Sequence, residues 1–241
     1  MRTLVVIATY NEIENLPPLV AAVLELALDL DVLVIDDRST DGTGRWARQH
    51  ASHNSRLQLI ERSGKLGLGT ASITGLKYAV EHHYDCVVTM DADFSHDPKH
   101  IPQLISRLSA ERCPVVDVVI GSRYVPGGGI QGWPLFRRWM SRAVNRYARW
   151  LMRLPVADCS GAFRCYRTVA LERLPLDRIR STGYSYLEEI LWALKQQGTS
   201  FAEIPIVFVD RQKGHSKINW REAITALWVI FRIGLFGTAR S

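Results

Sequence analysis

The chain has 241 residues, which suits one large α/β domain or at most two small ones. Hydrophobic residues make up 47% of it and charged residues 22%, a balance that argues against disorder, collagen or a coiled coil. Lys and Arg number 30 against 24 Asp and Glu, and the net charge of +6 indicates an anionic partner such as phosphate, nucleic acid or a membrane surface.

Short apolar runs alternate with helical patterns through the first half of the chain. We expect strands at residues 4–8, 32–35, 57–61, 86–90 and 115–121, and helices at 15–28, from 43, at 70–81 and after Pro98. This alternation predicts a mostly parallel, doubly wound sheet with helices on both faces. Further strands are expected at 161–167 and 201–209, and helices at 186–196 and 220–236. We find no repeat or long linker, so residues 1–241 are expected to form a single domain.

The four cysteines form no CxxC pair and no zinc-finger spacing. Cys159 and Cys165 are expected to be packing residues rather than a disulfide. No signal-peptide pattern precedes the first strand, and no window reaches the ~20 uninterrupted apolar residues of a membrane-spanning helix. The sequence therefore predicts a cytoplasmic protein and leaves peripheral membrane contact open.

Polar and acidic residues follow three of the expected strands. The first strand runs into Tyr10 and Glu12, the second into Asp36-Asp37, and the fourth into Asp91-Ala92-Asp93. Ligands of such sheets bind at the carboxyl ends of the strands. Two carboxylates in one cleft repel each other and need a cation, and oxygen ligands suit Mg²⁺ or Mn²⁺, with a diphosphate completing the coordination.

Helix capping is the alternative explanation for these acids. We favour it for Asp41 and Asp97, which stand directly before expected helix starts. It fits Asp91 and Asp93 less well, because they precede the helix start by several residues.

The segments VVIATYNE, VLVIDDRSTDGT, MDADFSHDP and VVIGSRY, in this order, resemble family 2 glycosyltransferases, which are inverting enzymes of the GT-A fold. The segments GSRYVPGG, DCSGAFRCYR and IPIVFVDRQKGHSK are similar to those of the dolichol-phosphate (polyprenol-phosphate) mannosyltransferases. The resemblance covers about residues 3–220. It implies a Rossmann-like sheet and metal-dependent transfer of mannose from GDP-mannose to a polyprenyl phosphate.

The resemblance also implies roles for individual residues. A nucleotide-sugar site would include Ala8, Tyr10, Glu12, Asp36, Asp37, Asp91, Ala92, Asp93, Arg123, Arg211 and Lys217. Ala8 stands where the family usually has Pro, which is expected to reduce loop rigidity rather than activity. Metal ligands would be Asp93 and Asp91, with Ser95 binding directly or through water.

The catalytic group would comprise Asp91, Asp93, Arg123 and Glu189, with Glu189 contacting the sugar or ordering an arginine. Ser160 and Arg164 are candidates for the acceptor phosphate; for Arg164 the alternative is an incidental arginine on a buried strand. A polyprenyl phosphate is already an anion, so the reaction would need no general base. His96 stands beside the acidic pair, and a turn role explains it at least as well as a catalytic one.

The basic segment 210–217 contains a glycine and could close over a diphosphate, with a solvated surface loop as the alternative. Residues 133–154 contain six arginines and no Asp, Glu or Lys, so the rest of the chain is neutral in balance.

At helical spacing, Arg138, Arg142, Arg146, Arg149 and Arg153 fall on one stripe, and aromatic and aliphatic residues occupy another face. This pattern predicts an interfacial helix on the cytoplasmic face of an anionic membrane, and residues 220–236 have a similar apolar face. The alternative is a core-packing helix with a solvated basic face. A separate membrane subunit is a further candidate partner.

Three other functions remain open from the sequence. The same chemistry could use a UDP-sugar such as UDP-glucose. A non-catalytic nucleotide-binding module would explain Asp36-Asp37 but not residues 133–154. A nucleic-acid-binding protein could use the arginine helix. We expect a membrane surface rather than nucleic acid as the partner.

Overall fold

The computed structural model describes residues 1–110, 115–211 and 220–237, with the backbone alone for 220–224 and 236. Its main sheet has the order β3-β2-β1-β4-β7-β5-β8, and β7 runs antiparallel to both neighbours. The strands are β1 (Thr3–Thr9), β2 (Leu30–Asp36), β3 (Leu57–Glu61), β4 (Cys86–Asp91), β5 (Val118–Ser122), β7 (Arg164–Arg167) and β8 (Phe201–Pro205). A second, parallel pair is formed by β6 (Gly129–Gln131) and β9 (Val207–Val209). The expected mostly parallel sheet is confirmed.

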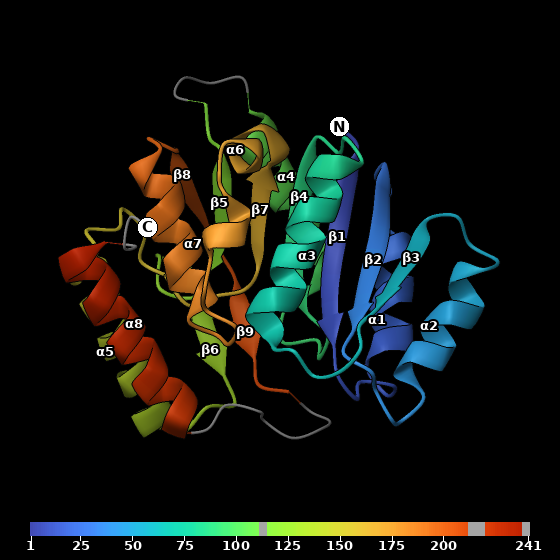
Figure 1. Cartoon of the computed structure of the whole chain (residues 1–241), viewed down its shortest axis with the longest axis horizontal. Helices are drawn as coiled ribbons and strands as arrows, with labels where there is room; N and C mark the ends of the chain where they lie inside the picture. Colours follow the sequence, from blue (N-terminus) through green and yellow to red (C-terminus); the bar gives the residue numbers. More distant parts are fainter. Residues whose placement is uncertain (111–114, 212–219, 238–241) are drawn as a thin grey trace.

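Helices cover both faces of the sheet (Figure 1). They are α1 (Leu16–Leu24), α2 (Thr43–Ala51), α3 (Leu68–Glu81), α4 (Ile101–Ser109), α5 (Leu135–Leu151), α6 (Thr168–Glu172), α7 (Tyr186–Gln196) and α8 (Trp220–Phe236), with short 3₁₀ turns η1 (Pro98–His100) and η2 (Leu176–Arg178). Alternate residues of β1 point to opposite faces: Val5 packs with Leu19 of α1, and Val6 packs with Leu76 of α3. Both faces are buried, which is why these strands are apolar throughout.

Several expected elements end elsewhere. The strand expected at 201–209 is divided at Ile206, whose backbone N–H donates to the Ser122 carbonyl (3.0 Å), so that β8 stays in the main sheet and β9 pairs with β6. The strand expected at 161–167 begins at Arg164, and the one expected at 115–121 begins at Val118. The helix expected to reach residue 28 ends at Leu24.

The described cysteines Cys86, Cys159 and Cys165 are free and buried. The packing role expected for Cys159 and Cys165 is confirmed. Cys113 lies outside the described residues.

Helices α5 and α8 lie side by side at one end of the molecule (Figure 1), with Gly234 of α8 against Leu151 of α5. Val144, Tyr147 and Leu151 pack against the core, so the core-packing alternative is right for that part of α5. Large apolar side chains on the outer surface of the pair stay exposed: Leu135, Phe136, Trp139 and Trp150 on α5, and Leu227, Trp228, Phe231 and Leu235 on α8. In the described part of the chain, no helix combines the length and apolarity needed to cross a membrane.

Gly75 sets how closely α3 approaches the sheet. A Cβ at this position would lie 2.3 Å from a methyl of buried Val6. We expect Gly75→Ala to lower the free energy of unfolding by about 1–2 kcal/mol. The added methyl group overpacks the contact with Val6, and this cost is larger than the gain in helix propensity. Urea denaturation measures this. Gly64→Ala is the control, because a Cβ there meets nothing within 4 Å; equal stability of the two variants would contradict the prediction.

Candidate active site

A cavity of about 230 Å³ opens at the carboxyl ends of β1, β2 and β4. Parallel pairing aligns these ends, with Ala8 opposite Asp91 and Thr9 opposite Asp36. The cavity is lined by Ala8, Thr9, Tyr10, Glu12, Asp37, Lys65, Gly67, Leu68, Ala71, Asp91, Ala92, Asp93, Gly183, Tyr184 and Arg211. Eight of the residues expected to bind a nucleotide sugar therefore meet here: Ala8, Tyr10, Glu12, Asp37, Asp91, Ala92, Asp93 and Arg211.

Asp93 is held by a tight turn. Its Oδ1 accepts hydrogen bonds from the Ser95 backbone N–H (3.1 Å) and hydroxyl (2.5 Å), and Phe94 between them has a positive φ of 58°. Its Oδ2 lies 3.0 Å from Nη2 of Arg211. Ser95 is buried and does not line the cavity, and in this structure its hydroxyl and backbone N–H hold Asp93 in position.

Asp91 faces the same cavity. Burial, together with the charge of Asp93, raises the pKa of Asp91 to about 7. Its backbone N–H donates to Nδ1 of His96 at 3.2 Å. His96 is buried and stacked on Phe163, and burial lowers its pKa to about 4, so the ring is neutral and acts as an acceptor in the turn.

The donor set of this cavity fits a hard divalent cation. Asp91 and Asp93 provide carboxylate oxygens, and the guanidinium of Arg211 supplies positive charge beside them. Within the described ranges, no three His, Cys, Asp or Glu side chains gather closely enough to hold a metal by themselves. Such a site suits Mg²⁺ or Mn²⁺, which bind through one or two carboxylates and complete their shell with water or phosphate oxygens.

Asp37 fixes the loop that leads into α3. Its side chain forms an ion pair with Arg62 and accepts from the backbone N–H groups of Leu66 (3.1 Å) and Gly67 (3.3 Å). In the same loop, Nζ of Lys65 lies 4.6 Å from the ring centroid of Tyr10. Arg62 and Lys65 were not among the expected site residues; the available signal was two basic residues in a glycine-rich segment after a strand.

The structure corrects the role expected for Asp36. Its buried carboxylate accepts from the hydroxyls of Thr9 (3.0 Å) and Ser39 (2.5 Å) and does not line the cavity. Consecutive residues at the end of an extended strand point in opposite directions, so Asp37 reaches the cavity and Asp36 does not. The capping role of Asp97 is confirmed: it is the N-cap of η1 and accepts from the backbone N–H of Lys99 (3.0 Å). Asp41 stands one residue before the N-cap of α2, Gly42, and accepts from the backbone N–H of Thr43 (3.0 Å) as a turn residue.

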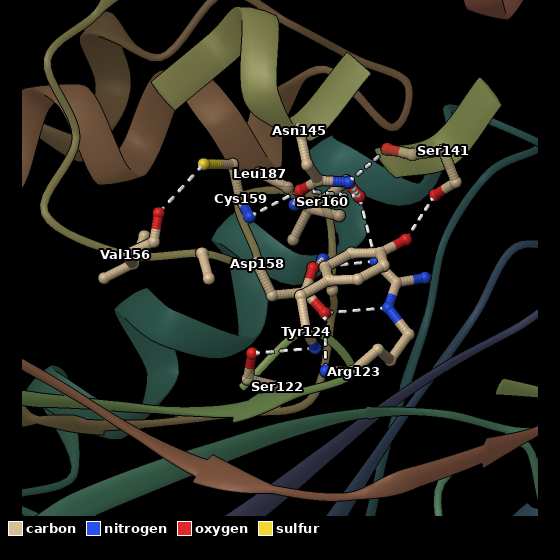
Figure 2. A network of polar contacts seen from close by, with 12 residues as sticks. Ser122, Arg123, Tyr124, Ser141, Asn145, Val156, Asp158, Cys159, Ser160 and Leu187 are labelled. Carbon is tan, nitrogen blue, oxygen red and sulfur yellow. Dashed lines mark hydrogen bonds and ion pairs between the residues drawn. The ribbon is translucent and has the colours of Figure 1, made fainter. Parts of the chain in front are cut away.

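Arg123 belongs to a buried network shown in Figure 2 rather than to the cavity lining. Its Nε and Nη2 each donate to Asp158 at 2.7 Å, and its backbone N–H donates to the same carboxylate at 3.0 Å. Although burial favours the neutral acid, the charge and hydrogen bonds of Arg123 lower the pKa of Asp158. The arginine fork is thus fixed in one orientation.

Asn145 connects this network to α5. Its Oδ1 accepts from the backbone N–H groups of Cys159 (2.7 Å) and Ser160 (3.2 Å), and its Nδ2 donates to the Ser160 hydroxyl (3.0 Å). The Ser160 hydroxyl also accepts from Arg123 (2.9 Å). Ser160 therefore positions Arg123 in this structure. The sequence alone does not identify Asp158 or Asn145 as site residues. The available signals were an acidic residue shortly before a strand, for Asp158, and the one amide in an arginine-rich helix, for Asn145.

Arg164 and Glu189 are fully buried, so neither side chain reaches a substrate in this structure. Arg164 donates to the backbone carbonyls of Cys159 (2.7 Å) and Leu187 (2.9 Å), which corrects its expected role at the acceptor phosphate and supports the alternative of a buried structural arginine. Glu189 accepts from the backbone N–H groups of Arg180 (3.1 Å) and Ser181 (2.9 Å) and orders the loop that lines the cavity at 183–184. Lys217 and most of the segment 210–217 lie outside the described residues.

The sheet, the aligned strand ends and the paired carboxylates define a glycosyltransferase of the GT-A type. The sequence pattern of Glycosyl transferase family 2 matches residues 4–174, and the chain belongs to this family. It is 40% identical over 219 residues to the undecaprenyl-phosphate mannosyltransferase of Micrococcus luteus, covering 91% of this chain and 88% of that protein. It is 37% identical over 237 residues to the polyprenol monophosphomannose synthase of Mycolicibacterium smegmatis, covering 98% and 88%.

Solved structures of more distant proteins share the fold. Glucosyl-3-phosphoglycerate synthase from Mycobacterium tuberculosis, in complex with Mn²⁺, UDP and glucosyl-3-phosphoglycerate, matches with a TM-score of 0.68 at 19% identity, covering 98% of this chain and 79% of that one. Mannosyl-3-phosphoglycerate synthase from Rubrobacter xylanophilus matches with a TM-score of 0.68 at 19% identity, covering 97% and 73%.

Asp158→Asn should separate donor binding from sugar transfer. The change removes the charge that holds Arg123, which lies outside the cavity at the strand ends. We expect transfer to fall at least about tenfold, while nucleotide affinity measured by calorimetry stays within about twofold. The control is Asp177→Asn, which removes an exposed ion pair with Lys77 and should change neither quantity. Equal losses of affinity and transfer in Asp158→Asn would contradict this role.

The buried side chain of Glu188 should make the free energy of unfolding depend on pH. Burial raises its pKa from an ordinary 4.5 to about 7, and its Oε2 has no hydrogen-bond partner among the described residues. The folded chain therefore binds a proton that the unfolded chain releases, and this destabilises the fold as pH rises from about 4.5 to 7. Glu188→Gln removes this effect, so its unfolding free energy relative to wild type should rise with pH, by up to about 1.4 kcal/mol per pH unit. Denaturant titrations across this range measure it, and a pH-independent difference would contradict it; exposed Glu172→Gln is the control.

Proposed function

We propose that the protein transfers mannose from GDP-mannose to a polyprenyl phosphate, with inversion at the anomeric carbon and dependence on Mg²⁺ or Mn²⁺. The observation that carries this proposal is the similarity, over nine-tenths of the chain or more, to the Micrococcus and Mycolicibacterium proteins, whose names specify polyprenyl mannosyl transfer. The cavity that holds Asp91, Asp93 and Arg211 would receive the nucleotide diphosphate.

The reaction is a displacement at the anomeric carbon. A phosphate oxygen of the acceptor forms the new bond as the bond to the GDP oxygen breaks, and the GDP leaves with both electrons. The acceptor is already anionic, so no proton has to be removed, in keeping with the neutral, buried His96. A divalent cation bound by Asp91 and Asp93 would supply Lewis-acid charge for the leaving diphosphate.

The chain's own residues would orient the substrates. Arg211 lies 3.0 Å from Asp93 and lines the cavity, from which its guanidinium can pair with the diphosphate. Lys65 adds a second positive charge beside Tyr10. The fixed fork of Arg123, joined to α5 through Ser160 and Asn145, would align the acceptor phosphate.

The acceptor's polyprenyl tail stays in the bilayer, so the enzyme needs a membrane-facing surface. The exposed face of α5 and α8 carries eight large apolar side chains, including Trp139 (69% exposed) and Trp150 (74% exposed). Arginines stand beside them on α5. We place this face on the cytoplasmic surface of the membrane as a peripheral contact; a separate anchoring subunit is compatible with it.

A donor screen tests the activity. Purified protein is incubated with vesicles containing a polyprenyl phosphate, Mg²⁺ or Mn²⁺, and either GDP-mannose or UDP-glucose. Mannosyl lipid formation that stops with EDTA is the expected result. Turnover of UDP-glucose but not GDP-mannose would overturn the proposed donor, and transfer undiminished by EDTA would overturn the metal dependence.

Asp93→Ala should abolish transfer while the fold survives. The change removes a carboxylate from the cavity without touching the core, and we expect a loss of at least about 100-fold in kcat. Circular dichroism checks the fold. Asp97→Ala is the matched control four residues further on: it removes a helix cap, so stability should fall by about 1 kcal/mol while transfer persists. Full activity of Asp93→Ala would refute the metal assignment.

A further inference from the structure

Asp210 stands between β9 and Arg211 and is held from three sides. Its backbone N–H donates to the carbonyl of Gln131 at the end of β6 (3.0 Å). Its Oδ1 accepts from the indole N–H of Trp133 (3.1 Å) and lies 3.5 Å from Nη1 of Arg137. These contacts fix the backbone at the point where the chain continues to Arg211.

Trp133 and Arg137 act as one unit at the start of α5. The guanidinium of Arg137 lies over the Trp133 ring, 4.0 Å from its centroid, so each side chain orients the other. Arg137 is in the first turn of α5 and stands apart from the stripe formed by the other five arginines of residues 133–154. Of these six arginines, it alone forms an ion pair with an acid in the described part of the chain. Asp210 is thereby joined to the helix that we place at the membrane.

Gly132 allows Asp210 to lie this close to the segment before α5. Its φ is 85°, and a Cβ at this position would lie 2.8 Å from the Cβ of Asp210. Only glycine has room here and adopts this backbone conformation without strain. Close packing of the backbone therefore supports the two polar contacts of the Asp210 carboxylate.

The strand that leads to Asp210 also contacts the turn that carries Asp93. The backbone N–H of Val209 in β9 donates to the Ser95 carbonyl at 3.2 Å, and the Ser95 hydroxyl donates to Asp93 at 2.5 Å. Arg211 and Asp93, whose side chains meet at 3.0 Å, are thus both positioned relative to β9. The place of the Arg211 guanidinium in the cavity depends on the backbone that Asp210 anchors.

We propose that Asp210 is a positioning residue for the transfer reaction. Trp133 and Arg137 hold its carboxylate, and Asp210 in turn holds the backbone from which Arg211 reaches the donor diphosphate. This inference rests on the role given to Arg211 in the proposed function. It goes beyond that function because it makes the cavity at the strand ends depend on a contact from the first turn of α5.

A double-mutant cycle on the whole chain tests whether Asp210 acts through Arg211. Wild type, Asp210→Ala, Arg211→Gln and the double variant are titrated with GDP and with UDP in the presence of Mn²⁺, by calorimetry without vesicles. Asp210→Ala removes both side-chain contacts and leaves the backbone bond to Gln131. The control is Asp29→Ala, an exposed acid whose side chain has no partner among the described residues.

Nucleotide affinity should fall at least about tenfold in Arg211→Gln and at least about fivefold in Asp210→Ala. In the Arg211→Gln background, Asp210→Ala should change it by no more than about twofold, because the group that Asp210 positions is already absent. The control should stay within about twofold of wild type. Losses that multiply in the double variant would overturn the inference in favour of a general structural role.

Conservative variants keep the test valid where Asp210→Ala folds poorly. Arg137→Lys retains the positive charge beside Asp210 and should bind nucleotide more tightly than Arg137→Gln. In transfer assays Arg137→Gln should raise the KM of the nucleotide sugar and leave the KM of polyprenyl phosphate unchanged. Equal affinity of Arg137→Lys and Arg137→Gln, or a rise in both KM values, would contradict the link through Asp210.

The affinity measurements separate this inference from the proposed function. If a nucleotide binds but no mannose is transferred, the cycle still decides the role of Asp210, and the proposed function fails alone. If mannose is transferred but the cycle shows independent effects, the inference fails alone. If wild type binds neither nucleotide, both fail.

Discussion

Repulsion between two carboxylates is the constraint around which this molecule is arranged. Asp91 and Asp93 line a cavity of only about 230 Å³, and the pKa of Asp91 is raised to about 7 because its half-buried carboxyl group is desolvated and close to Asp93. Such an arrangement is unfavourable unless positive charge offsets it. Arg211 supplies that charge in this structure, and Ser95 fixes Asp93 so that the carboxylate cannot turn away. A bound cation and diphosphate would meet a site already organised for them.

The antiparallel strand β7 completes the site from the other side. Parallel strands bring only their carboxyl ends to this edge of the sheet. Because β7 runs the opposite way between β4 and β5, the segment that precedes it arrives at the same edge. Asp158 and Ser160 therefore meet Arg123, which follows β5. The cavity at the strand ends and the Arg123 network thus come from different parts of the chain.

The sequence predicts the cavity at the strand ends better than the network around Arg123. Alternating strands and helices are enough to place Ala8, Asp37 and Asp93 together, because parallel strand ends must align. Burial is decided by tertiary packing, so Asp36 and Arg164 could not be assigned from motifs alone. Lys65 reaches the cavity through a loop conformation that Asp37 fixes, and no periodicity encodes it.

Helix α5 shows the same limit. Its period of 3.6 residues correctly separates the arginine stripe from the apolar residues. It does not say which apolar residues pack inward: Val144 and Tyr147 contact the core, whereas Trp139 and Trp150 stay exposed. That division depends on where α8 lies.

The side-by-side placement of α5 and α8 has a mechanical consequence. Each helix has 17 residues and is about 25 Å long. A single helix lying on a flat membrane surface can rotate about its long axis, whereas two helices packed against each other cannot rotate independently. On the proposed bilayer surface, the pair would thus fix the height and tilt of the strand-end cavity relative to the lipid phosphates. The acceptor would then reach the site by lateral diffusion in the bilayer, and the enzyme would not have to rotate on the membrane to meet it.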